Sequence, residues 1–441
     1  MVSSSFATLV GAAILASGTA ASPLPVAQRG LIGDFLGKVD NALSGALNGL
    51  LNIVSPAAPT SDTAALASLT SIFGGSGSTG FVSSAEALLK AGFVPSPLSQ
   101  LVNVNATYTT GENSQTNSNP DPPTSIFPAP AGDAPYSLDE ATLRQAIFIP
   151  DSFTNGAKPP LLIVPGTGQP SFMTYNPNLL PVLQNSAFAD PVWLNVPGFL
   201  LGDAQQSAEY IAYATHYIGA RTGKKVTLIA YSQGNIITQW ALTFWPSMRS
   251  IVSDFVGMSA AFRGSSLVTD GCVPIQDLGI GCPPAIHQQT LNSNFVNAMI
   301  KHGGDSALVP TTIMFSATDE IAQPQTGDDA VALLKDANNV GYTGVRTQDA
   351  CAGKLAGGVA THEGMLYHPL TLAMLEDAMA NDGPGDLSRV DTDRLCGQAV
   401  ADGMSLSALV QTEAGLVLAG GAFIEYRPYE QDEPAVASYA A

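Results

Sequence analysis

The feature that most restricts the fold is a series of short apolar runs, separated by stretches of helical periodicity, that begins after about residue 136. Each run has the length of a buried strand, and together they cover residues 160–164, 191–196, 226–231, 254–259 and 311–316. Helical spacing marks residues 207–219 and 235–245, and Pro246 ends the second stretch because proline cannot continue a helix. Buried strands that alternate with helices predict an α/β fold, with a mostly parallel sheet covered by helices on both faces.

A serine directly follows one of these runs. Residues 226–231 lead into Ser232, and a helical pattern starts at once with Gln233 and Gly234. A strand, a sharp turn and a helix around a serine form a nucleophile elbow, where small residues two positions before and after the serine let strand and helix pass closely. Those positions hold Ala230 and Gly234, so alanine replaces the first glycine of G-x-S-x-G. The pattern predicts a catalytic nucleophile at Ser232; the alternative is a structural serine at a strand end.

A serine hydroxyl needs a base to remove its proton, and histidine is the expected base. On this fold the order along the chain is serine, then an acid, then histidine. With an acid near Asp319, only His362 and His368 satisfy this order. His362 lies in a glycine-rich loop before a helix, whereas His368 falls in the helical pattern that follows and is expected to have a packing role. We therefore predict His362 as the base.

The acid is expected on a loop just past a strand. Residues 311–316 are such a strand, and Asp319 and Glu320 follow it. Asp319 is the preferred acid, which would orient the imidazole and stabilise its charged form, and Glu320 is its local competitor. The remaining acidic residues of this region are expected to be solvated, namely Asp328, Asp329 and Asp336.

An oxyanion also needs hydrogen-bond donors. One is expected to be the backbone N–H of Gln233, and the other to come from the loop after an early strand. Residues 161–168 end such a strand in a turn that can present Thr167, by its backbone N–H and by its hydroxyl. An ordinary turn is the alternative here.

Taken together, these segments resemble the Candida antarctica lipase B family. The matching segments are residues 162–168 (Leu-Ile-Val-Pro-Gly-Thr-Gly), 231–234 (Tyr-Ser-Gln-Gly), 239–244, 311–312, 316–321, 323–324 and His362. They occur in the family's order over residues 136–429. The resemblance implies an α/β-hydrolase fold with no metal and no cofactor, a triad of Ser232, Asp319 and His362, and an oxyanion hole at Thr167 and Gln233.

The same resemblance assigns a substrate pocket. It implies pocket positions at Tyr231, Gln289, Ile321 and Ala261. Tyr231 stands where the family has tryptophan, and Ala261 where the family has an acidic residue. Residues 269–284 carry an insertion at the position of the family's small lid helix. These departures concern substrate preference rather than the chemistry.

The four cysteines suit an oxidising compartment and allow three pairings. Pairing of sequence neighbours favours Cys272–Cys282 and Cys351–Cys396, and the second pair also matches a family disulfide. We expect the first pair to tether a lid-like segment. The spacings match no zinc or redox motif.

Composition limits the partners. The chain has 17 Lys and Arg against 36 Asp and Glu, a formal charge of −19, and this excludes an electrostatic footprint for nucleic acid or anionic lipid surfaces. An ester substrate, small or lipid, must therefore be attracted by apolar surface, at a lipid–water interface if it is a lipid. No later stretch holds about 20 uninterrupted apolar residues, so we expect no stable membrane insertion. We expect a monomer.

The N-terminus predicts export and an extension. Residues 1–21 have the apolar run and small-residue end of a signal peptide, which predicts secretion and gives meaning to the glycosylation sequon at Asn105. A lone Arg29 marks a second processing position. Residues 22–135 form a helical extension, with helices expected at 32–54, 63–72 and 83–91 and a linker at 113–132; the catalytic domain is residues 136–441. The interpretation we prefer is a helical pro-segment or an extension packed on that domain; the other is an apolar cap over the active site or a lipid-contacting arm.

These observations predict a secreted lipase that hydrolyses carboxylic esters, triacylglycerols among them, through an acyl-enzyme. One rival is an esterase or acyltransferase that uses the same triad on non-lipid esters. The other is a lipid-binding protein that keeps the fold without catalysis, and the complete set of Ser232, Asp319 and His362 argues against it.

Overall fold

A computed structural model describes residues 57–75, 80–93, 108–268 and 281–441. Its centre is a seven-stranded sheet with the order β1-β3-β2-β4-β5-β6-β7. The strands are β1 (Ile147–Phe148), β2 (Pro160–Val164), β3 (Asp190–Leu194), β4 (Val226–Tyr231), β5 (Val252–Met258), β6 (Thr311–Phe315) and β7 (Tyr342–Arg346). Only β1 pairs antiparallel, with β3, and the other neighbouring pairs are parallel. The predicted α/β class and mostly parallel sheet are confirmed.

Helices complete the fold. The α-helices are α3 (Asp62–Phe73), α4 (Gly80–Lys90), α6 (Glu140–Gln145), α7 (Ser171–Tyr175), α8 (Leu179–Asn185), α9 (Ala204–Thr222), α10 (Gln233–Phe244), α12 (Pro284–Gln288), α13 (Asn294–Lys301), α14 (Thr347–Ala350), α15 (Pro369–Ala380), α16 (Thr392–Leu395), α17 (Leu406–Glu413) and α18 (Gly415–Glu425). Short 3₁₀ turns are η3 (Gly111–Asn113), η4 (Pro246–Ser250), η6 (Leu355–Gly357), η7 (Glu363–Leu366) and η8 (Leu387–Arg389). None of the helices in the described ranges is long and apolar enough to cross a membrane.

The five predicted strands all occur, with ends within two residues of those expected. The sequence analysis missed the two edge strands. β1 has only two residues, which is too short for a periodic signal, and β7 is mostly half-exposed and contains Gly344, so it lacks a continuous apolar run. Central strands β2, β4 and β6 are buried along their whole length, and this explains why their apolar runs could be recognised.

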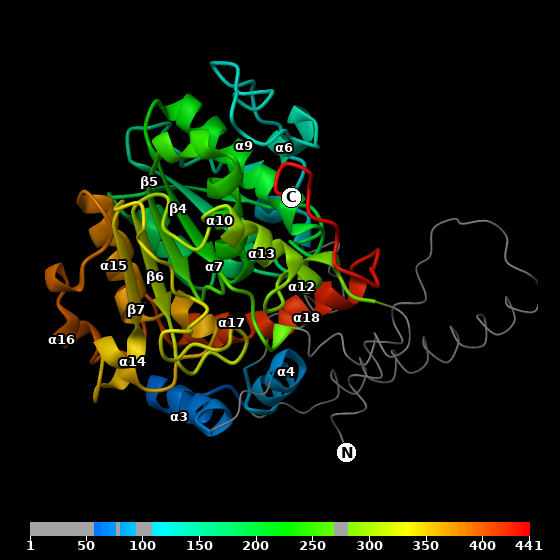
Figure 1. The fold of residues 1–441 in the computed structure, drawn as a ribbon. Coiled ribbons are helices and arrows are strands. Elements are labelled where there is room, and N and C mark those ends of the chain that lie inside the picture. The colour runs from blue at the N-terminus through cyan, green and yellow to red at the C-terminus, as the bar shows by residue number, and fades with distance from the viewer. Residues whose placement is uncertain (1–56, 76–79, 94–107, 269–280) are drawn as a thin grey trace, which may run out of the picture.

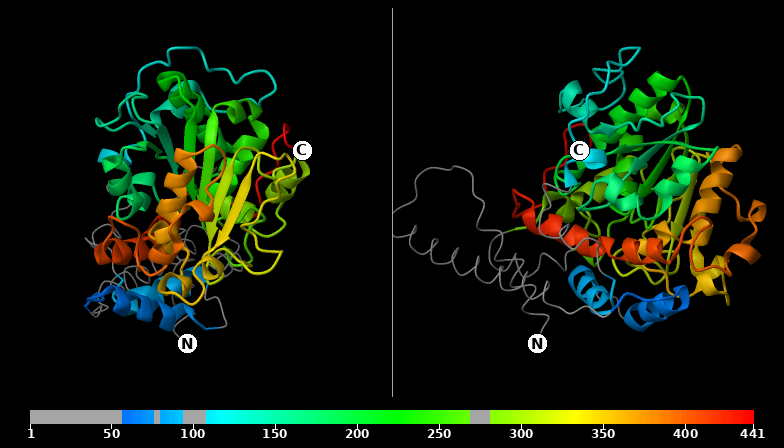
Figure 2. Two further views of the ribbon diagram at one scale, coloured as in Figure 1. Left: turned by 90° about the vertical axis from the view of Figure 1, so that its left-hand side faces the viewer. Right: turned by 180° about the vertical axis from the view of Figure 1, so that it is seen from behind.

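Two apolar layers cover the sheet, one on each face. Helices α9 and α10 pack on one face, where Tyr213 and Trp240 are buried, and α8 and α15 pack on the other, where Leu183 and Leu375 are buried. Figures 1 and 2 show α15 on one side of the sheet and α10 and α13 on the other. This two-sided burial of the sheet is the physical reason for the short, purely apolar strands in the sequence.

A smaller layer of helices lies across one end of the sheet. The C-terminal helices α17 and α18 run between the sheet and the N-terminal helices α3 and α4 (Figures 1 and 2). Leu69 of α3 and Leu88 of α4 pack with Leu409 of α17 and Val417 of α18 in one apolar cluster. We call α3, α4, α17 and α18 the helical cap. The cap joins the two ends of the chain, which the sequence analysis did not foresee.

Several predictions for the N-terminal part can be compared with this arrangement. The helices expected at 63–72 and 83–91 are confirmed as α3 and α4. Residues 114–132 lack regular structure, as expected for a linker, but they are bound to the main domain: Asn119 Nδ2 donates to the Ile147 carbonyl and Asn195 Nδ2 donates to the Ser114 carbonyl. The signal peptide, Arg29, the expected helix at 32–54, Asn105 and Cys272 lie outside the described residues.

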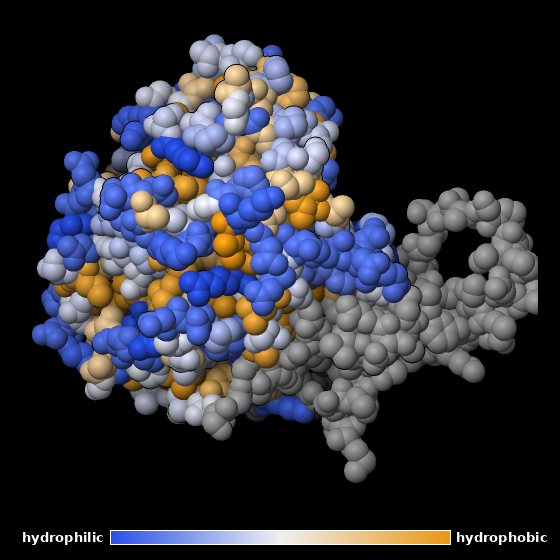
Figure 3. Space-filling view, in the orientation of Figure 1, coloured by the Kyte–Doolittle hydropathy of each residue, from blue (hydrophilic) through white to orange (hydrophobic). Residues whose placement is uncertain are grey.

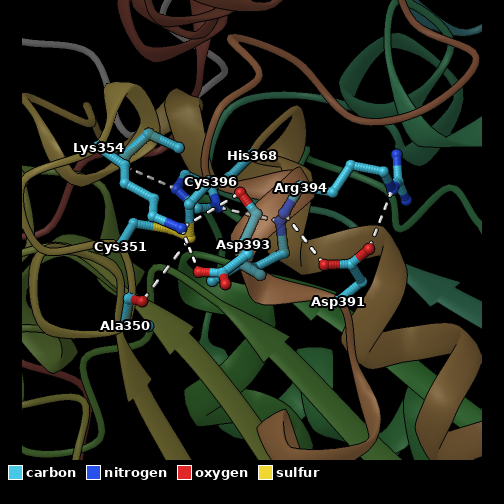
Figure 4. Close-up of a disulfide and its surroundings, with 10 residues drawn as sticks. Ala350, Cys351, Lys354, His368, Asp391, Asp393, Arg394 and Cys396 are labelled. Atoms are coloured by element: carbon cyan, nitrogen blue, oxygen red, sulfur yellow. Dashed lines mark hydrogen bonds and ion pairs between the residues drawn. A yellow bond between two sulfur atoms is a disulfide. The ribbon is translucent and has the colours of Figure 1, made fainter.

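A disulfide joins Cys351 to Cys396, as predicted, and closes a loop with a sequence separation of 45 (Figure 4). Both cysteines are buried, and Lys354 pairs with Asp393 next to the bridge. Cys282 is also disulfide-bonded, which agrees with the prediction for that residue. The bridge ties the segment after β7, which leads to the histidine loop, to α16.

Removing this bridge should destabilise the protein. We expect the double substitution Cys351→Ser and Cys396→Ser to lower the free energy of unfolding by about 2 to 4 kcal/mol, because the bridge restricts the unfolded chain. Urea unfolding of the variant and the wild type, both with the other disulfide intact, measures the difference. Equal midpoints in urea would show that the bridge does not stabilise the fold.

Candidate active site

Ser232 sits in the turn between β4 and α10, at the centre of the sheet. Its backbone has φ 53° and ψ −126°, an unfavourable conformation for a residue other than glycine, which costs about 1 to 3 kcal/mol. The chain can turn this sharply only where its neighbours are small. A Cβ added at Gly234 would lie 2.5 Å from the Pro165 carbonyl oxygen, and Ala230 is completely buried. The strand, turn and helix predicted around Ser232 are therefore present with the expected crowding.

The predicted histidine and aspartate lie beside this serine. His362 Nε2 is 2.7 Å from Ser232 Oγ, and His362 Nδ1 is 2.8 Å from Asp319 Oδ2 and 3.0 Å from Asp319 Oδ1. His362 and Asp319 are both buried, at 4% and 1% exposure. Asp319 Oδ1 also accepts the backbone N–H groups of Ile321 and Ala322 at 2.9 and 2.7 Å, which orient the carboxylate. The three residues form one continuous hydrogen-bonded chain.

The competing residues make other contacts. Glu320 accepts the backbone N–H of His362 at 2.9 Å, whereas the His362 ring nitrogen Nδ1 contacts Asp319. His368 is buried at the N-cap of α15, where its Nδ1 accepts from Leu370 N and its Nε2 bonds the Ala356 carbonyl. Burial lowers the pKa of His368 to about 4. A structural role for His368, as predicted, fits these contacts.

The other acidic residues of this region have different surroundings. Asp328 and Asp329 are exposed, as expected. Asp336 caps a loop instead, since its carboxylate accepts the backbone N–H groups of Val340 and Gly341.

The predicted oxyanion donors are adjacent to each other. Thr167 Oγ1 donates to Gln233 Oε1 at 2.7 Å, and Gln233 Nε2 donates to the Leu200 carbonyl at 2.7 Å. Gln233 begins α10, and the N–H groups of a first helical turn have no acceptor within the helix. Gly166 permits the approach of this loop to the elbow, because a Cβ there would lie 2.8 Å from the Tyr231 ring. The side chain of Gln233, which the sequence analysis did not use, therefore locks the Thr167 loop in place.

A cavity of about 870 Å³, open to solvent, lies in front of Ser232 and His362. Among the predicted pocket residues, Tyr231, Gln289 and Ile321 line this cavity, and Ala261 lines an adjoining cavity of about 330 Å³ that also reaches Ser232. The sequence analysis missed the outer wall of the large cavity. Its apolar members are Met173, Val268, Ile286, Leu416, Ala419 and Phe423.

The chain is similar to known proteins in sequence and in fold. No protein-family model matches the chain. Lipase B of Pseudozyma antarctica is 32% identical over 201 residues, which cover 45% of this chain and 57% of that relative, so the match spans little more than half of its length. The crystal structure of Aspergillus fumigatus lipase B matches with a TM-score of 0.82 and 36% identity, and the match covers 99% of both chains. The chain belongs to the lipase B family.

Membership of the lipase B family confirms the resemblance from which several site residues were inferred. The structure shows the setting of two predicted pocket residues. The centroid of the Tyr231 ring lies 5.1 Å from that of the His362 ring, and Tyr231 lines the large cavity. Ala261 lines the smaller cavity with a small, uncharged side chain. The described residues contain no group of three or more His, Cys, Asp or Glu placed to hold a metal ion.

Electrostatics around His362 favour its protonated form. Burial, the largest single influence, opposes a charged imidazole, but Asp319 together with the nearby Glu363 and Glu413 outweighs it, and the pKa of His362 lies above its ordinary value. Burial, and after it the nearby Glu363, raises the pKa of Glu320 well above its ordinary value. The carboxyl group in direct contact with the imidazole is that of Asp319.

Replacing Asp319 should show which of the two candidate acids, Asp319 or Glu320, supports the histidine in this lipase B family member. We expect Asp319→Asn to reduce kcat/KM for ester hydrolysis by about 10⁴-fold, because the imidazole loses its orientation and the partner of its charge. The acid limb of the pH–rate profile should also move to lower pH, since burial without the carboxylate lowers the pKa of His362.

The matched control is Glu320→Gln, whose amide oxygen can still accept the His362 N–H. We expect a loss below about tenfold and an unmoved acid limb, because the orientation of the ring is retained. A larger effect at Glu320 than at Asp319 would assign the acid to Glu320.

Proposed function

We propose that this protein is a secreted lipase that hydrolyses carboxylic esters, triacylglycerols among them, through a triad of Ser232, His362 and Asp319. One observation carries the proposal: a strained serine, hydrogen-bonded through a histidine to a buried carboxylate, opens into a large apolar cavity. Membership of the lipase B family supports a lipase or esterase on the α/β-hydrolase fold.

The proposed reaction follows from the contacts. Ser232 Oγ attacks the ester carbonyl carbon while its proton moves to His362 Nε2, which is 2.7 Å away. The carbonyl oxygen becomes an oxyanion that accepts the backbone N–H groups of Thr167 and Gln233. The C–O bond to the alcohol breaks as His362 returns the proton to the leaving oxygen, which leaves an acyl-enzyme on Ser232. Water then attacks the acyl carbon, His362 takes its proton, and the acid is released with Ser232 restored.

The apolar lining of the cavity favours a lipid-like substrate. Its outer part is formed by aliphatic and aromatic side chains of the cap and of α7 and α12, which can bury an acyl chain with a gain of about 0.8 kcal/mol for each buried CH₂. Figure 3 shows apolar residues among the polar ones on this face of the molecule. Because a formal charge of −19 would not attract the protein to an anionic lipid surface, contact with a lipid–water interface would depend on such apolar groups. No part of this proposal requires a cofactor or more than one copy of the chain.

Secretion is part of the proposal. It rests on the signal-like residues 1–21, and the two disulfide-bonded sites at Cys351–Cys396 and Cys282 suit an oxidising compartment. We propose that residues 22–135 are an extension of the catalytic domain, with its ordered helices packed in the cap, and that Asn105 is glycosylated after export.

Kinetics with two substrate classes test this function. We expect hydrolysis of soluble short-chain p-nitrophenyl esters and of emulsified long-chain triacylglycerol, with both activities lost by at least about 10⁴-fold in Ser232→Ala. Activity on short soluble esters alone would favour the rival esterase, and transfer to an added alcohol in excess of hydrolysis would favour the acyltransferase.

A pair of histidine variants is the matched control. His362→Ala should lose activity as Ser232→Ala does, whereas His368→Ala should change thermal stability more than kcat. Equal losses of kcat in the two folded variants would contradict the choice of His362 as base. No hydrolysis by the folded wild type would favour the lipid-binding protein.

A further inference from the structure

Three glutamates are buried beside the proposed triad, and the reaction above uses none of them. Glu320, Glu363 and Glu413 are 2%, 4% and 0% exposed. Burying a carboxyl group is unfavourable unless hydrogen bonds compensate the lost hydration. Three such groups around one histidine therefore call for a physical reason, and Glu413 has the best-defined contacts.

Glu413 holds both ends of the turn that carries His362. Its Oε1 accepts the hydroxyl of Thr361 at 2.6 Å and the hydroxyl of Tyr367 at 2.6 Å. Thr361 directly precedes His362, and Tyr367 directly follows η7, the 3₁₀ turn that begins after His362. The Thr361 hydroxyl in turn accepts the backbone N–H of Gly364 at 2.9 Å. One carboxyl oxygen thus fixes the whole turn.

Glu413 belongs to the cap, not to the sheet that carries Ser232 and Asp319. It is the last residue of α17, two residues before α18 begins. Leu416 and Phe423 of α18 line the substrate cavity, and Leu409 of α17 packs against α3 and α4. The Thr361 and Tyr367 hydrogen bonds therefore connect the histidine turn to the same helices that form the cavity wall.

We propose that Glu413 is a positioning residue for the proposed ester hydrolysis: it ties the His362 turn to the cap and holds the imidazole at hydrogen-bond distance from Ser232. This inference rests on the proposed function. The other side of the turn is held by the body of the domain, where Ser259 Oγ donates to the His362 carbonyl at 2.7 Å and Glu320 accepts the His362 N–H. Removal of Glu413 would take away the hydrogen bonds by which α17 holds Thr361 and Tyr367.

The protonation state of Glu413 suits this role. Burial and the neighbouring Glu363 raise the pKa of Glu413 to about 8, against the lowering effect of its two hydroxyl donors and of His362. Glu413 is therefore uncharged at neutral pH, and a neutral carboxyl still accepts two hydroxyl groups at its carbonyl oxygen. The titratable groups that face it are Glu363, Glu320, His362 and Tyr367.

Kinetics on a soluble short-chain p-nitrophenyl ester test the proposal. We expect Glu413→Ala to lower kcat by about tenfold or more at pH 7 with KM changed less than about twofold, because a misplaced base affects the chemical step rather than binding. Glu413→Gln keeps an amide oxygen as acceptor and should restore kcat to within about threefold of the wild type.

Leu409→Ala is the control for an effect that comes only from weaker packing of the helical cap. Leu409 is buried in α17, does not line the cavity and has no polar group that could hold the histidine turn by a hydrogen bond, so its variant should lose stability while kcat stays within about twofold of the wild type. Equal kcat in Glu413→Ala and Leu409→Ala would overturn the proposal.

A gentler variant decides the matter if Glu413→Ala does not fold. Tyr367→Phe removes only one of the two hydroxyl donors to Glu413, and we expect kcat to fall about threefold. Unchanged kcat in Tyr367→Phe would then overturn the proposal. If the proposed function is wrong, the wild type itself will not hydrolyse the ester, and this outcome differs from failure of the Glu413 proposal alone.

The pH dependence of stability provides an independent readout. The pKa of Glu413 is about 8 in the folded protein against 4.5 ordinarily, so its contribution is present below pH 4.5 and is lost as pH rises through 8. We expect the Tm of the wild type to fall over this range and that of Glu413→Gln, which cannot ionise, to fall less. Parallel Tm curves for the two proteins would show that Glu413 does not titrate with a raised pKa.

Discussion

The hydrogen bond between Ser232 and His362 is the interaction on which the rest of the site depends. It joins two parts of the chain that are 130 residues apart, and it forms only because the backbone of Ser232 is held at φ 53° between β4 and α10. Such a conformation persists only where surrounding structure fixes it. Here the fully buried β4, the close approach of Gly234 to Pro165 and the packed helix α10 provide that restraint.

The histidine has no comparable element of its own. It lies in a loop between β7 and α15, and its position comes from contacts on several sides. Asp319 holds the ring, Ser259 and Glu320 hold the backbone, and Glu413 holds the turn from the cap. The same cap forms the outer wall of the cavity, so the geometry of the base and the shape of the pocket depend on the same helices.

Local sequence patterns predicted those elements in which burial or crowding restricts the choice of residue. The elbow at Ser232, the acid after β6 and the five buried strands were recognisable because burial and crowding leave few alternatives. Two kinds of feature could not be predicted. Edge strand β7 lacks an apolar run because solvent reaches it, and Glu413 appears in the sequence as an ordinary helical glutamate, because its partners Thr361 and Tyr367 are about 50 residues away. Residues 416–424 form an apolar run in the sequence, which is typical of a buried helix.

Reaction with a fluorophosphonate probe tests the central claim most directly, because such a probe labels a serine only where a base activates it. The labelled peptide is mapped by mass spectrometry in the wild type and in His362→Ala. The account predicts a label on Ser232 of the wild type and none on Ser232 of the variant. A folded wild type that stays unlabelled, or that carries its label on another serine, would contradict it.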